Sequence, residues 1–260
     1  MRDLNPTPAW MNHQYTGAPD ARDMYIETGI RAAVGTSHWG AWDKRLYETS
    51  ATLDRKRLLA WARERPDGSL IYFDDYGWDR LPWHIRKEIC EVLCAACPLF
   101  GIYRQLPVRD WYAPQAMSSN PELRAYYANA HAEWGEKNEA MSSWAKRVNV
   151  ICPSLYVLKQ GDGFSVEWIE TYARETISQA RQYGKPVIPF VWPREHFSGR
   201  TGLTFETLAW VDLDVWEALL RVIRDEADGV IWWDASKMAF EAMRRTEHFR
   251  VFSRVFGIRR

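Results

Sequence analysis

Short apolar runs alternate with segments of helical periodicity along most of the chain. The run SLIYF at residues 69–73 is typical of a strand, and the segment that follows at about 82–97 repeats its apolar residues with a helical period. The pattern predicts strands at 30–36, 69–73, 99–105, 148–157, 185–193 and 228–234, and helices near 53–65, 82–97, 121–145, 165–183 and in the second half of 204–227.

Strands that alternate with helices indicate βα units around a parallel sheet, either an open doubly wound sheet or a barrel. No G-x-G-x-x-G or G-x-x-x-x-G-K-[ST] motif follows a strand, so a nucleotide-dependent transferase has no support. Polar and aromatic residues instead recur at the carboxyl ends of the strands, where barrel enzymes carry their active sites. The predicted fold class is therefore α/β, a (β/α)8 TIM-barrel-like fold, either complete or irregular and incomplete.

One barrel domain is expected over residues 25–260, preceded by an irregular arm at residues 1–24. The arm contains Pro6, Pro8, Gly17 and Pro19 and shows neither a strand period nor a helix period. An arm of this kind is expected to lie over the barrel opening or to dock on a partner in a protein assembly.

The charge balance argues against nucleic acid as a partner, because 34 Lys and Arg are matched by 34 Asp and Glu. The chain is instead rich in large aromatic residues, with 15 Trp and 12 Tyr, whose flat rings suit stacking against sugars. Cys90, Cys94 and Cys97 share one apolar helical face, so we expect buried thiols there, with no metal and no cofactor.

No apolar run has the length of a signal peptide or a membrane span. The chain is accordingly expected to be soluble, without a membrane partner, and either cytoplasmic or released by a non-classical route. The reduced thiols favour the same compartments.

The sharpest candidate for chemistry is the pair Asp74 and Asp75, directly after the strand at 69–73. Two close carboxylates can raise one pKa, which a general acid near neutral pH requires. Tyr76 and Trp78 flank the pair as a sugar platform would. The structural alternative is a pair of acids that caps the next helix.

A second carboxylate is expected from Glu195 in WPREHF or from Asp234 in IWWDAS. Either would lie about 5 to 9 Å from Asp75 across a barrel opening, a separation compatible with glycosidase geometry. Asp162 in a Gly-rich turn is a weaker candidate, and His38 has no recognisable partner for base catalysis.

From residue 69 to residue 236 the order of motifs resembles that of the hyaluronidase family of barrel glycosidases. The motifs are IYFDDYGW, FGIYRQLP, SSWAKRVNVICPSLYV, YGKPVIPFVWP and DGVIWWD. The resemblance implies a barrel glycosidase in which the acidic turn supplies the general acid and the substrate's acetamido group is the nucleophile. This mechanism is an exception to the usual two carboxylates.

The resemblance also implies roles for individual residues. Asp74 or Asp75 would occupy the acidic turn, Tyr103 and Tyr156 would line the subsite of the reacting sugar, and Trp232 would form its floor. The family's catalytic Glu is not matched, because aligning Asp74 with the family's Asp puts Tyr76 in the position of the Glu. An Asp would replace that Glu, another acid would serve, or hydrolysis would be absent.

The sequence thus predicts a glycoside hydrolase that acts on a polysaccharide or oligosaccharide at the carboxyl end of a barrel. Its catalytic residues would be Asp75, assisted by Asp74 or Glu195. The residues expected to bind the sugar are Tyr76, Trp78, Tyr103, Tyr156, Trp192, Trp232, Trp233 and Asp234. The alternative is a non-catalytic carbohydrate-binding or structural barrel that is a subunit of a larger assembly.

Overall fold

Six strands run parallel in one sheet in the computed structural model of the chain. The structure describes residues 7–12, 30–35, 50–73, 81–158, 165–196, 208–234 and 238–259. The strands are β1 (Ala9–Asn12), β2 (Arg31–Gly35), β3 (Leu70–Phe73), β4 (Phe100–Ile102), β5 (Phe190–Val191) and β6 (Val230–Trp232). Their spatial order is β4-β3-β2-β1-β6-β5, so β1 pairs with β6, and β4 and β5, which follow one another in the sequence, lie at the two edges of the sheet.

The two edge strands are joined through residues 151–154. Tyr103, which directly follows β4, forms a parallel bridge with Cys152, and Ser154 forms a parallel bridge with Phe190 of β5. The sheet therefore curls round and closes into a ring of parallel segments. This ring is an incomplete (β/α) barrel and confirms the predicted fold class, although the expected strand at 148–157 is reduced to isolated bridges.

A glycine makes the closure possible. A Cβ atom on Gly101 of β4 would lie 2.5 Å from the Sγ of Cys152 and 3.0 Å from the backbone oxygen of Val150. The first contact is shorter than real Cβ atoms show and the second is tight, so glycine lets the segment around Cys152 pack this closely against β4.

The strands divide their side chains between two cores with a period of two. In β3, Leu70 and Tyr72 belong to the core inside the barrel, whereas Ile71 and Phe73 belong to the core between the strands and the helices. This alternation is what a closed sheet covered by helices requires, because one face of each strand meets the barrel interior and the other meets the helix layer.

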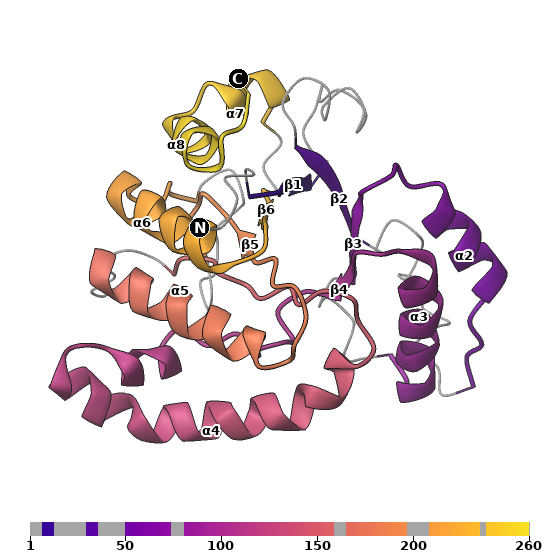
Figure 1. Ribbon diagram of the computed structural model, residues 1–260, viewed down its shortest axis with the longest axis horizontal. Coiled ribbons are helices and arrows are strands. Elements are labelled where there is room, and N and C mark those ends of the chain that lie inside the picture. Colours follow the sequence, from indigo (N-terminus) through magenta and orange to yellow (C-terminus); the bar gives the residue numbers. More distant parts are fainter. Residues whose placement is uncertain are drawn as a thin grey trace.

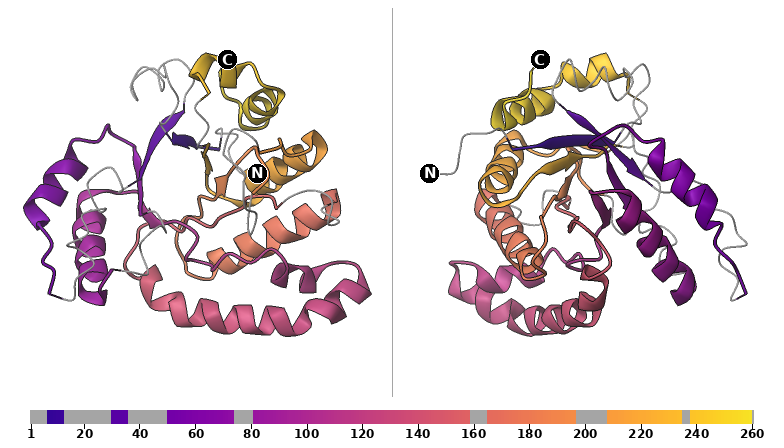
Figure 2. Two further views of the ribbon diagram at one scale, coloured as in Figure 1. Left: turned by 180° about the vertical axis from the view of Figure 1, so that it is seen from behind. Right: turned by 45° about the vertical axis from the view of Figure 1, so that its right-hand side comes forward.

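The helices surround the strands, as Figures 1 and 2 show. They are α2 (Arg55–Arg63), α3 (Trp83–Ala96), the 3-10 helix η4 (Ala113–Met117), α4 (Pro121–Ala145), α5 (Val166–Arg181), α6 (Leu213–Glu226), α7 (Phe240–Arg244) and α8 (Glu247–Phe256). Side chains of Asp54, Asn120, Ser165, Asp212 and Thr246 cap five of them by accepting a hydrogen bond from the first turn.

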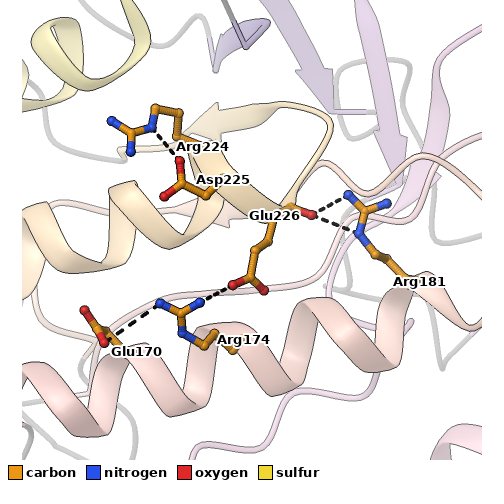
Figure 3. A network of polar contacts seen from close by, with 6 residues as sticks. All are labelled: Glu170, Arg174, Arg181, Arg224, Asp225 and Glu226. Atoms are coloured by element: carbon orange, nitrogen blue, oxygen red, sulfur yellow. Dashed lines mark hydrogen bonds and ion pairs between the residues drawn. The ribbon is translucent and has the colours of Figure 1, made fainter. Parts of the chain in front are cut away.

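The outer surfaces of α5 and α6 are linked by a polar network (Figure 3). Arg174 of α5 forms an ion pair with Glu226 and lies 4.0 Å from Glu170, while the Nε of Arg181 donates to the backbone oxygen of Glu226 at 2.9 Å. These side chains are largely exposed, so the network fixes the register of the two helices more than it adds stability.

Part of the expected irregular arm at residues 1–24 is a strand, because residues 9–12 form β1 between β2 and β6 in the sheet. Residues 1–6 and 13–24 lie outside the described residues. The strand is only four residues long and follows Pro8, so it carries too few positions for a period to show. Its pairing partners on both sides supply the hydrogen bonds that make it a strand.

The expected cysteine face agrees with the structure. Cys90 and Cys94 of α3 and Cys97, which directly follows it, are free thiols; Cys90 and Cys97 are buried and Cys94 is partly buried. Burial raises the pKa of Cys97 to about 11 and also raises that of Cys94, so both thiols are unreactive. Among the described helices, none is long and apolar enough to cross a membrane.

Candidate functional site

Four aromatic rings meet where the barrel strands end. The ring of Tyr156 lies 5.6 Å, between centroids, from the rings of Tyr103, Trp192 and Trp233, and it is stacked on Trp233 at 28°. Trp192 and Trp233 are 5.0 Å apart and nearly perpendicular. We call these four residues the barrel-end cluster. All four are candidates from the sequence, and the structure brings them together.

The strand period explains why these rings converge. Phe190 of β5 and Ile231 of β6 point into the barrel, and Trp192 and Trp233, two residues further along, point the same way. Tyr103 follows β4 and reaches the same end of the parallel sheet. Tyr156 and Trp192 are buried and Trp233 is half-buried, so Trp233 offers the most accessible ring of the cluster.

His196 packs against the cluster and is held in its neutral form. Its ring lies 5.9 Å from that of Tyr156 and 5.3 Å from that of Trp111. Burial, together with the positive charges of Arg109 and Arg104, lowers the pKa of His196 to about 3. Neutral His196 can accept a hydrogen bond at Nε2 from the guanidinium of Arg109, whose Nη1 lies 3.3 Å away.

The segment that carries Arg109 and Trp111 is fixed from two sides. The indole N–H of Trp111 donates to the backbone oxygen of Tyr156 at 2.7 Å. On the α4 side, the indole N–H of Trp134 donates to the backbone oxygen of Val108 at 2.6 Å. Helix α4 therefore positions the loop beside the barrel-end cluster.

Asp234 lies beneath the cluster in a buried charged pair. Its side chain is fully buried, and its Oδ1 accepts from the indole N–H of Trp192 at 3.3 Å and lies 3.8 Å from the Nε of Arg194. Arg194 also donates to the backbone oxygen of Leu208 at 3.0 Å and covers the ring of Trp210 at 4.2 Å. Asp234 is thus placed to orient Trp192 and to neutralise Arg194 in the interior.

Glu195 lies between Arg194 and His196 in the sequence, and it is buried. Its backbone N–H donates to the oxygen of Ala209 at 2.9 Å, which fixes the short antiparallel contact of Arg194 with Trp210. This candidate carboxylate therefore belongs to the same rim of the barrel as His196.

Trp232 lies on the other side of the sheet. Its ring is fully buried in the outer core, with ring centroids 5.6 Å from Trp216, 5.8 Å from Phe249 and 5.0 Å from Phe252. The side chain of its neighbour Trp233 points toward the barrel interior, where the resemblance would place Trp232. The ring of Trp232 is accordingly part of the packing between β6 and the helices α6 and α8.

The acidic candidates Asp74 and Asp75 lie outside the described residues, and so do Tyr76 and Trp78. The weaker candidates His38 and Asp162 also lie outside them. Within the described part of the chain, no group of three His, Cys, Asp or Glu side chains is arranged to hold a metal ion.

Comparisons with known proteins give similarities of structure only. No family model matches the chain, and no curated protein matches it. Bee venom hyaluronidase in complex with a hyaluronic acid tetramer is similar at 18% identity and a TM-score of 0.44, over 86% of this chain and 66% of that chain. The chain therefore spans just under two thirds of the length of that enzyme.

Two further solved structures are similar. One is a broad-specificity endoglucanase from an uncultured bacterium, at 8% identity and a TM-score of 0.41, over 87% of this chain and 70% of that chain. The other is a glycoside hydrolase family 5 enzyme from Prevotella bryantii in complex with a xyloglucan tetradecasaccharide, at 9% identity and a TM-score of 0.32, over 96% of this chain and 95% of that chain. The identities are too low to carry residue roles to this chain.

Sequence reasoning missed the basic and aromatic partners of the cluster. His196 is adjacent to the candidate Glu195, and Arg194 follows the strand-end motif FVWP, so their positions were a usable signal. No comparable sequence signal marks Arg109 and Trp111, because they reach the cluster through a loop whose path is set by α4. Only the folded chain brings that loop to Tyr156.

Proposed function

We propose that the protein is a glycoside hydrolase that acts on a polysaccharide at the carboxyl end of its barrel. The barrel-end cluster is the observation that carries this proposal. Four aromatic rings on the ends of consecutive parallel segments, with hydroxyl and indole groups among them, combine flat apolar faces with polar edges, as a sugar ring requires.

The proposed acid is Asp75, with Asp74 or Glu195 assisting. Phe73, the last residue of β3, pairs with Ile102, the residue before Tyr103. Since Asp74 and Asp75 follow Phe73 in the sequence, we propose that they act at the same end of the barrel as Tyr103. The acid would protonate the glycosidic oxygen, while the ring of Trp233 holds the sugar beside it.

Neutral His196 and the pair Asp234 and Arg194 have supporting roles in this proposal. His196 accepts from Arg109 and carries no charge near neutral pH, so it helps to hold Arg109 beside the cluster. Asp234 is a positioning residue rather than a second catalytic carboxylate, because it is fully buried and bonded to Trp192.

The test is release of reducing ends from hyaluronan, xyloglucan, glycol chitin and hydroxyethyl cellulose. We expect one of these polymers to be cleaved by the wild type and not by Asp75→Asn. The matched control is Asp67→Asn, which makes the same chemical change at an exposed turn before the start of β3 and is expected to keep full activity.

Equal activity of Asp75→Asn and the wild type would remove the assignment of the acid. Binding of a polymer without any cleavage would instead mean that the barrel holds carbohydrate and does not hydrolyse it.

A further inference from the structure

A second group of aromatic rings lies on the surface where η4, α4 and α5 meet. Tyr126 is 78% exposed and Tyr112 is 37% exposed, which is unusual for side chains of this size. Tyr127 lies between them, 5.9 Å from the ring of Tyr112 in a stacked arrangement at 23° and 4.8 Å from the ring of Tyr126 at 85°. We call Tyr112, Tyr126 and Tyr127 the outer platform.

The outer platform rests on a buried tryptophan. Trp168 of α5 is 6.0 Å from the ring of Tyr112 and 5.9 Å from the ring of Tyr127, edge-on to both. The fully buried side chain of Gln115 donates from Nε2 to the backbone oxygen of Trp168 at 3.0 Å, which ties η4 to α5. The rings of Tyr112 and Tyr127 are thus held by the fold before any ligand arrives, so little conformational entropy is lost there on binding.

The start of η4 is fixed as well. The Oδ1 of Asp110 accepts from the backbone N–H groups of Tyr112 and Ala113, both at 2.9 Å. This contact sets the direction of Tyr112 relative to its neighbour Trp111.

The outer platform begins one residue after the rim of the barrel-end cluster. Trp111 donates to the backbone oxygen of Tyr156 and packs 5.3 Å from His196, and the next residue is Tyr112. The loop that carries Trp111 and Tyr112 therefore contacts the cluster with one residue and the platform with the next.

We propose that the outer platform is a second carbohydrate-binding surface, on which a polysaccharide chain stacks beyond the part held at the barrel end. The proposal rests on the proposed function and extends it, since it predicts a preference for polymers over short oligosaccharides. Three tyrosines have the amphipathic rings that suit a sugar, each with a hydroxyl at its edge. They are too few for a stable contact with a second copy of the chain, which needs about 20 to 30 residues from each partner.

The test compares the dissociation constants of a polymer and of its tetrasaccharide for matched variants. The probes are soluble hyaluronan, xyloglucan, glycol chitin and hydroxyethyl cellulose, each with the corresponding tetrasaccharide. For the double variant Tyr112→Ala and Tyr126→Ala, we expect the polymer to bind about tenfold more weakly, because two stacking rings are lost. Binding of the tetrasaccharide is expected to stay unchanged.

Two controls separate stacking from general effects. Tyr126→Phe keeps the ring and loses only the hydroxyl, so it is expected to lose less polymer affinity than the double variant. Trp83→Ala removes another exposed ring, which packs 4.4 Å from Trp144 at the far end of α4 (Figure 1). Trp144 lies about 27 Å along the helix from Tyr126, so this variant is expected to bind normally.

Three outcomes would overturn the proposal. The first is unchanged polymer affinity in the double variant, and the second is a wild type that binds none of the four polymers. The third is a change in sedimentation from dimer to monomer in the double variant, which would make the platform a self-association surface. If the polymer binds through the platform and no glycosidic bond is cleaved, the platform stands and the proposed hydrolysis fails.

Discussion

Two neighbouring tryptophans at the end of β6 have opposite environments. Trp232 is fully buried against Trp216, Phe249 and Phe252 in the layer between the barrel and the helices. Trp233 is half-buried and stacks on Tyr156 at the end of the barrel. The same residue type is therefore packed in the outer core at one position and partly exposed at the barrel end at the next.

The difference follows from strand geometry. Successive side chains point to opposite faces of a strand, so a shift of one residue moves a ring from the helix layer to the barrel interior. A count of tryptophans cannot separate these two populations. The face of the strand to which each side chain points does separate them. It assigns Trp192 and Trp233 to the candidate site and Trp232 to the core.

The largest expected effect tests this division directly. Trp232→Ala should lower the free energy of unfolding by about 3 to 5 kcal/mol, because it leaves a large cavity in the outer core. Trp233→Ala should lower it by only about 1 kcal/mol and should weaken polysaccharide binding. Urea unfolding of both variants measures the first quantity, and affinity electrophoresis measures the second. Equal losses of stability would show that the two rings do not differ in the way their positions indicate.

A smaller effect is expected from the charged pair under the cluster. Asp234→Leu leaves the guanidinium of Arg194 buried without its carboxylate, which should cost about 3 kcal/mol of unfolding free energy. Replacing both residues, with Arg194→Met beside Asp234→Leu, should recover part of that loss because no charge is then left unpaired.

The pair also bears on the site, because Asp234 accepts from Trp192. Asp234→Leu should therefore change the shift in tryptophan fluorescence that accompanies ligand binding in the wild type. Urea unfolding of Asp234→Leu and of the double variant measures their free energies of unfolding. A double variant less stable than Asp234→Leu would contradict the assignment of the cost to an unpaired Arg194.

The smallest expected effect is on how the free energy of unfolding depends on pH. The pKa of His196 falls from its ordinary value of 6.5 to about 3 in the folded chain, so the unfolded chain binds the proton more readily. The stability that this residue contributes is complete above pH 6.5 and is lost as the pH falls from 6.5 toward 3. When the pH is lowered from 7.5 to 4.5, the free energy of unfolding of His196→Gln should therefore fall less than that of the wild type.

Urea midpoints at the two pH values check this expectation. His131→Gln is the control, since it removes a histidine from the contact between α4 and Glu175, away from the cluster. A decline in His196→Gln as steep as in the wild type would mean that its ring is not kept neutral by burial and by Arg109.

Much of the architecture was predictable because it depends on local pattern. The helix at 121–145 has the predicted bounds, with Asn120 as its cap, and the strand run at 69–73 became β3. The pattern did not reveal β1, whose four residues carry no period of their own. Nor did it show that 148–157 would contribute isolated bridges, since the number of hydrogen bonds depends on how closely the neighbouring strands approach.

For the candidate site, sequence reasoning found the aromatic residues at strand ends but not their partners. Tyr103, Tyr156, Trp192 and Trp233 were expected at the barrel opening, and they do meet. Asp234 was expected to contact sugar, and the structure shows it buried beneath the cluster. Its burial depends on Arg194 and Trp192, which are distant from it in the sequence.

The amino-acid sequence by itself determined the alternation of strands and helices, the even charge and the abundance of aromatic rings, because these are properties of composition and short-range period. The tertiary structure alone decided which aromatic rings gather at the barrel end. It closed the ring of strands through Cys152, set His196 beside Arg109, and packed Trp111 against His196. These outcomes require contacts between segments far apart in the chain, and no local pattern contains that information.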